Sequence, residues 1–151
     1  MDTGQPAISK RARVKARSKT VQAIYQWLLT SKEASDILGE FEHDAHTLAR
    51  TDVAYFKDLF LGVIKHKDEL ETHFSGLLDR SLDELDAIER AILLIGSYEL
   101  EHHIELPYRV VVNESIELAK TFGAEDSHKY INGVMDKLAH QLRSVEMQQS
   151  V

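Results

Sequence analysis

Hydrophobic residues recur every three or four positions through most of the chain, which is the spacing of amphipathic helices. Val, Ile and Thr do not alternate with polar residues over any window of strand length. Two prolines and seven glycines are few interruptions for 151 residues, and such a low number favours long helices. The pattern therefore predicts an all-α protein with about six or seven helices.

The first predicted helix begins near Lys10 and carries different side chains on its two sides. One side is apolar and comprises Val14, Val21, Ile24 and Leu28, with Trp27 beside it. The opposite side is polar and largely cationic and comprises Arg11, Lys15, Lys19, Gln22 and Gln26. Arg17 falls among the apolar positions, so its side chain either extends to the rim or is held by an acidic partner.

Further along, the apolar spacing indicates five more helices. The segment 85–100 is the most apolar of them and is predicted to be a central helix, buried on most sides. The others are a short helix over 31–41, a long helix from Thr51-Asp52 to about Gly76, a helix from Pro107 to Gly123, and a last helix over 126–143. Residues 43–50 are polar and are predicted to form a loop.

Several residues mark where these helices begin, end or pack. Ser81 with Glu84 matches a capping box for the central helix. Pro107 suits the first turn of a helix, and Gly123 suits a helix C-terminus. Gly133 lies within the last helix, where glycine costs about 1 kcal/mol relative to alanine. Its presence there predicts the close approach of a neighbouring helix.

The predicted helices suggest a division of the chain into two halves. Residues 1–9 and 146–151 are expected to be disordered tails, because they lack periodic apolar positions. Residues 10–78 form an N-terminal helical unit with the basic first helix, and residues 79–145 form a C-terminal helical unit.

Charge is distributed unevenly along the chain. The net charge is −7, yet residues 1–20 hold six basic side chains and one aspartate. An acidic body with a basic N-terminal arm is typical of a protein that meets a polyanion, although a solvated basic tail has the same composition. The absence of cysteine excludes disulfides and thiolate metal sites, and no apolar run is long enough to span a membrane. These features predict a cytoplasmic protein.

Catalytic and metal-binding motifs are not evident. The chain has no glycine-rich phosphate loop and no serine elbow, so no enzymatic activity and no cofactor are predicted. Among eight histidines, His43 and His46 are three apart and His102 and His103 are adjacent. Adjacent histidines point to different sides of a helix, and no further ligands are implied, so no metal site is predicted.

Two segments are candidates for binding nucleic acid. Basic residues at helical spacing in the first helix suit a phosphate backbone. In the run 122–134 (FGAEDSHKYINGV), a turn leads into a helix N-terminus, whose free N–H groups bind anions or base edges. Asp126 either contributes to this site or simply caps the helix. Tyr130 either stacks on an unpaired base or belongs to the core.

This last run resembles the C-terminal motif of the NusB family, and three other segments support the resemblance. The first comprises residues 107–120 (PYRVVVNESIELAK). The second comprises residues 16–27, which begin with Ala16-Arg17 and end with VQAIYQW. The third comprises residues 89–100, which begin with ERAIL and end with YEL. The resemblance covers residues 10–143. It implies an all-helical fold of two small packed bundles, and an RNA-binding transcription antitermination factor without enzymatic activity.

The resemblance also implies partners and site residues. The partners are boxA RNA of ribosomal RNA operons, the small-subunit ribosomal protein NusE, and an antitermination complex with RNA polymerase. Glu89 matches a position near the shared RNA and partner surface. The residues implied for RNA are Arg13, Lys15, Arg17 and Tyr25 in the first helix, and Asp126, Lys129 and Tyr130 in the last. Val14 stands where the family often has another arginine, and Ser18 where it often has an acid. Lys19 joins the residues implied for RNA, because it compensates for the diluted arginine cluster.

Three other functions are compatible with parts of the sequence. An RNA-binding domain of a ribosomal RNA cytosine methyltransferase would need a further catalytic domain. A protein–protein adaptor would make the basic arm incidental. A helix-turn-helix DNA reader would carry its basic residues on a second helix after a tight turn, and not on the first. The sequence is compatible with both a monomer and a homodimer.

Overall fold

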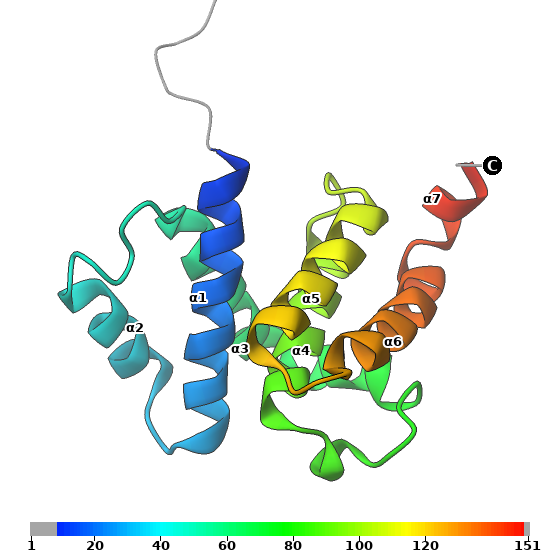
Figure 1. Cartoon of the computed structure of the whole chain (residues 1–151), viewed down its shortest axis with the longest axis horizontal. Helices are drawn as coiled ribbons and strands as arrows, with labels where there is room; N and C mark the ends of the chain where they lie inside the picture. The colour runs from blue at the N-terminus through cyan, green and yellow to red at the C-terminus, as the bar shows by residue number, and fades with distance from the viewer. Residues whose placement is uncertain (1–8, 150–151) are drawn as a thin grey trace, which may run out of the picture.

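The computed structural model describes residues 9–149, which form seven α-helices and one 3₁₀ turn, with no strand in that range (Figure 1). This confirms the predicted all-α class. None of the helices in the described part is long and apolar enough to cross a membrane. The elements are α1 (Lys10–Leu29), α2 (Ala34–His43), α3 (Val53–Ser75), η1 (Leu82–Glu84), α4 (Ala87–His102), α5 (Tyr108–Phe122), α6 (Ser127–Leu142) and α7 (Ser144–Gln149).

The central helix of the fold is α4, as its apolar sequence predicts. Residues 91–100 are all buried, because α4 packs against α1, α3, α5 and α6. The buried hydrophobic side chains form one cluster that extends from Ala16 in α1 to Ala139 in α6. The two predicted halves, 10–78 and 79–145, thus share a core around α4, and the boundary between them stays a prediction.

Polar side chains cap the N-termini of α1, α3 and α4, although not always those predicted. Asp52 caps α3 as expected, with its carboxylate accepting from the Tyr55 N–H. The prediction of a capping box at Ser81 is wrong. Ser81 makes no capping bond, and Asp86 caps α4 by accepting from the N–H groups of its first turn. The chain makes a 3₁₀ turn after Ser81 and buries Leu85, so the helix begins only at Ala87.

The C-terminal segment is more ordered than the sequence predicts. Residues 146–149, expected within a disordered tail, belong to α7. Glu146 accepts from the Tyr108 N–H at 2.9 Å and pairs with Arg143. Arg143 is itself buried and donates to backbone carbonyls at the end of α4, including Leu100 at 2.7 Å. No local sequence pattern predicts these contacts, because they join residues that are far apart in the chain. Ser9 caps α1, whereas residues 1–8 and 150–151 lie outside the described part of the chain.

Gly133 does not mark a close helix contact, so that prediction is wrong. A Cβ atom at Gly133 would have nothing within 4 Å, because the residue faces solvent. The close approaches occur at other glycines. A Cβ at Gly62 in α3 would lie 2.3 Å from the Tyr98 ring of α4, and one at Gly96 in α4 would lie 2.6 Å from Met135 of α6.

Candidate nucleic-acid interface

The basic residues of α1 divide into two groups on different sides of the helix. Lys15 and Lys19 are four residues apart and share one side, and Arg13 and Arg17 are also four apart and share another. Arg13 and Arg17 face Tyr55 of α3, with their guanidinium carbons 4.7 and 5.5 Å from the ring centre. The single cationic arm predicted from the sequence is therefore two structurally different sets of side chains.

Arg17 is held in the interior by an acidic partner. Its side chain is only 4% exposed, and its Nε donates to both carboxylate oxygens of Glu99 at 2.9 and 3.2 Å. The Tyr55 hydroxyl donates to the same carboxylate. Burial, together with the nearby Glu99 charge, raises the pKa of Tyr55, so its hydroxyl stays protonated as a donor.

This burial changes the role expected for Arg17. Of the two alternatives left by the sequence, the structure shows the acidic partner. Moving the Arg17 side chain out of the interior to reach an RNA phosphate would break the pair of its Nε with Glu99 and leave a buried carboxylate without its cation, which is costly. Arg17 fixes α1 against α4 through this pair and thereby positions the exposed residues of α1, and its contact with RNA stays a prediction.

Arg13 lies at the edge of a groove between α1 and α5. Its side chain is 37% exposed, and its Nε lies 3.6 Å from Asp52. The remaining lining of the groove comes from the N-terminal halves of both helices and the turn before α5, and includes Lys10, Val14, Leu106, Val110 and Asn113. The partial exposure of Arg13 leaves it accessible to a ligand in this groove.

Lys15 and Lys19 line a second groove, between α1 and the loop that follows α2. His46 and Arg50 of that loop lie on its other side. Among the described residues, neither lysine nor Arg50 has an ion-pair partner within 4.0 Å, so the groove is cationic. Arg50 adopts a left-handed conformation, with φ of 58°. The sequence did not indicate Arg50 and His46 as part of a binding surface, because the loop is recognisable only as polar.

Tyr25 lies further along α1 and is 38% exposed. Its ring has no aromatic or cation–π partner in the described part of the chain, so a face is free to stack on a base. Tyr25 lies seven residues beyond Ser18 and ten beyond Lys15, a span of about 15 Å along the helix axis from the lysine. α1 therefore presents cations at one end and an aromatic ring at the other.

The second predicted group gathers where the N-termini of α4 and α6 meet. Glu89 of α4 is 8% exposed and accepts from the Ser127 hydroxyl of α6 at 2.8 Å. Asp126 does not cap α6 with its side chain and has a φ of 72°, a conformation uncommon for a residue other than glycine. Its carboxylate lies 3.3 Å from Lys129, and both side chains are mostly exposed. Asp126 and Lys129 are thus accessible, whereas Glu89 serves as a structural link.

Tyr130 combines features of both predicted alternatives. It packs against the hydrophobic core, and its hydroxyl is buried without a hydrogen-bond partner. Burial raises its pKa. One ring face is covered by the Arg80 guanidinium, whose carbon lies 4.5 Å from the ring centre. Arg80 is exposed and was not predicted, since nothing local in the sequence connects it to Tyr130.

The structure therefore brings the predicted residues into two groups. Figure 1 shows α1 and α5 side by side and running in the same direction, and their N-terminal halves line one groove. The first group lies along α1 and the second at the start of α6. Each combines accessible cations with an aromatic ring, the two features that recognise single-stranded RNA.

Comparison with known proteins identifies the family. Residues 14–140 match the family model described as the NusB family. Transcription antitermination protein NusB of Nitrosomonas eutropha is 47% identical over 141 residues, which cover 93% of this chain and 84% of the relative. The protein of the same name from Alcanivorax borkumensis is 50% identical over 135 residues, covering 89% of each chain.

Solved structures agree with this result. T. maritima NusB is 25% identical, with a TM-score of 0.71, and the match covers 88% of this chain and 92% of that one. A chain in the crystal structure of antitermination factors NusB and NusE in complex with dsRNA is also 25% identical, with a TM-score of 0.74 and coverage of 86% and 97%. The present chain belongs to the NusB family of transcription antitermination proteins, which are not enzymes.

Proposed function

We propose that this protein binds boxA RNA of ribosomal RNA operons together with NusE, and so supports read-through by RNA polymerase in the cytoplasm. The observation that carries the proposal is the groove of Lys15, Lys19 and Arg50, whose cations have no acidic partner among the described residues. A related chain has been crystallised with NusE and dsRNA, which supports both partners.

The residues have different roles in this proposal. Lys15, Lys19 and Arg50 bind phosphates, Arg13 extends that surface, and Tyr25 stacks on a base. Asp126, Lys129 and Tyr130 form a second contact at the start of α6. Glu89 shapes the adjoining surface for RNA and NusE through its bond with Ser127, and Arg17 positions α1 from the interior.

Fluorescence anisotropy with a boxA RNA and a scrambled RNA, with and without NusE and across a salt series, tests the proposal. We expect boxA to bind more tightly, and NusE to increase the preference. Lys15→Ala/Lys19→Ala should weaken binding and lower the salt slope by about 1.4, since each lost phosphate contact contributes about 0.7 for single strands.

The matched control is Lys120→Ala/Lys137→Ala, which removes two exposed lysines of α5 and α6 and should leave the slope unchanged. Equal binding to both RNAs, unaffected by NusE, would contradict the proposal and favour a protein adaptor.

Light scattering after size-exclusion chromatography, with and without RNA, tests whether a homodimer forms and whether RNA dissociates it.

A further inference from the structure

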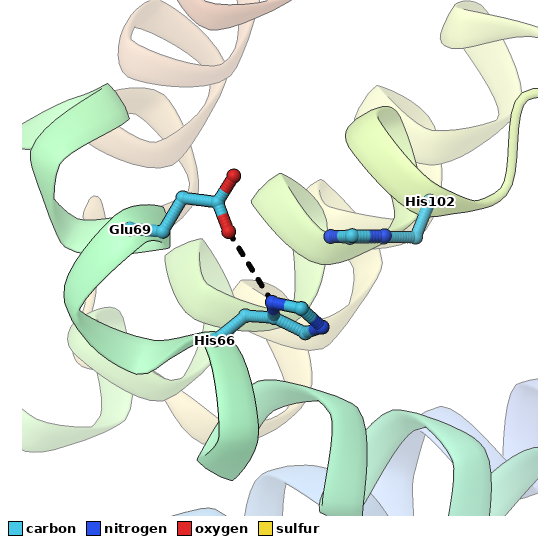
Figure 2. Close-up of side chains that lie close together, drawn as sticks. All are labelled: His66, Glu69 and His102. Carbon is cyan, nitrogen blue, oxygen red and sulfur yellow. Dashed lines mark hydrogen bonds and ion pairs between the residues drawn. The ribbon is translucent and has the colours of Figure 1, made fainter.

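A cluster of histidine and glutamate side chains lies between α3 and α4, apart from the residues proposed for RNA. Figure 2 shows His66 and Glu69 of α3 facing His102 of α4. One ligand atom from each of the three lies within 4.8 Å of the others. His66 Nδ1 is 3.2 Å from Glu69 Oε2, and the rings of His66 and His102 are 4.5 Å apart at their centres.

Two more side chains extend the cluster. Glu69, His73 and Glu101 form a second set with ligand atoms within 4.8 Å of one another. The Glu101 carboxylate pairs with His73, and its Oε1 lies 3.5 Å from His102 Nε2. Residues 66, 69 and 73 are three and four apart, so they share one side of α3. The further ligands that were missing from the sequence around His102 thus come from another helix.

The carboxylates in this cluster lack a permanent cation. Among the described residues, Glu69 and Glu101 pair only with histidines, and neither has a Lys or Arg within 4.0 Å. A bound cation would neutralise these carboxylates, which meet no lysine or arginine in the described part of the chain.

We propose that this cluster is a binding site for a divalent transition-metal ion of the zinc class, with His66, Glu69 and His102 as ligands. The Glu101 carboxylate lies beside this set, with Oε1 3.5 Å from His102 Nε2. Imidazole and carboxylate ligands suit Zn²⁺, whereas Mg²⁺ and Ca²⁺ prefer oxygen ligands alone. The ion would join α3 to α4, two helices that already pack against each other.

This site is separate from the proposed RNA surface. Glu89 and Glu101 both belong to α4 and are twelve residues apart, so about 18 Å of helix separates them. None of the residues lining the cationic groove of Lys15 and Lys19 belongs to the cluster. Metal binding can therefore be measured without RNA, and its outcome is independent of the proposed RNA function.

The test is isothermal titration calorimetry of the full chain with zinc chloride, after removal of any affinity tag and of bound metal with a chelator. We expect one ion per chain and little heat with magnesium chloride. His66→Ala/His102→Ala should weaken zinc binding by more than about tenfold, a loss that even outer partners of metal ligands can cause. Zinc should also raise the Tm of the wild type, because the unfolded chain lacks the site.

The control is His43→Ala/His140→Ala, which removes two exposed histidines outside the cluster and should leave zinc binding unchanged. Glu69→Gln keeps the shape of the side chain and should also weaken binding, so the test does not depend on one variant. Circular dichroism checks that each variant is folded. Absence of saturable zinc binding, or an equal loss in the control, would overturn the proposal.

Discussion

Arg17 shows how a single side chain can stabilise this fold while standing within a motif associated with RNA. It occupies an apolar position of α1, and it is buried because Glu99 of α4 and Tyr55 of α3 surround its guanidinium. A buried charge pair is costly to break, since removing one member leaves the other uncompensated. Replacing Arg17 should therefore lower the stability of the fold, whatever its effect on RNA contacts.

We expect Arg17→Met to lower the free energy of unfolding by about 3–5 kcal/mol, because it leaves Glu99 buried without its cation. Combining it with Glu99→Leu should cost less than the sum of the two single changes, since no lone charge remains. Urea unfolding measures both. The exposed pair of Lys32 and Glu40, 2.7 Å apart, is the control, and Lys32→Ala should cost less than about 1 kcal/mol. Additive single effects would contradict this account.

At the scale of the helices, caps and glycines decide where the elements begin and how closely they pack. The long helix α3 begins at the expected cap, Asp52, whereas α4 begins after Asp86 because the preceding residues form a 3₁₀ turn. The glycines of two helices have different surroundings. Gly133 of α6 faces solvent, whereas Gly62 of α3 makes room for the Tyr98 ring.

Gly133→Ala should stabilise the protein by about 0.5–1 kcal/mol, because alanine has the higher helix propensity and nothing near its Cβ would clash. Gly62→Ala should have the opposite sign and cost about 1–3 kcal/mol, because the Tyr98 ring must move from its buried position. Thermal unfolding of both variants beside the wild type measures the difference. A destabilised Gly133→Ala would show that Gly133 has a packing role that the structure does not reveal.

At the scale of the whole molecule, α4 joins the two halves of the chain. It packs against α1 and α3 on the N-terminal side and against α5 and α6 on the C-terminal side. The same helix carries Glu89 at its start and Glu101 at its end. The start of α4 thus supports the proposed RNA contact at α6, whereas its end contributes His102 to the proposed metal site, so both depend on how α4 packs.

We expect the two halves to unfold together in one transition, because their buried side chains form one cluster around α4. Trp27 is the only tryptophan and lies in α1, so its fluorescence reports on the N-terminal half. Urea curves followed by Trp27 fluorescence and by circular dichroism, which reports on all helices, should coincide. Curves with separate midpoints would show that residues 10–78 and 79–145 are independent units.

The sequence by itself determined the features that depend on neighbouring residues. Helical periodicity predicted an all-α chain with a buried central helix. The polar Asp52 predicted the start of α3, and the motif around Asp126 indicated the family, since a motif is read from consecutive residues. Each of these properties is local, because a helix repeats every 3.6 residues and its cap acts within one turn.

Only the tertiary structure decided which distant residues meet. It buried Arg17 against Glu99, 82 positions away, and placed Arg50 beside Lys15 and Lys19. It also ordered the segment after Arg143 through contacts with the end of α4, and brought His102 to the acidic side of α3. No short-range pattern encodes these meetings, because they depend on how the packed core sets the angle and register of each helix pair.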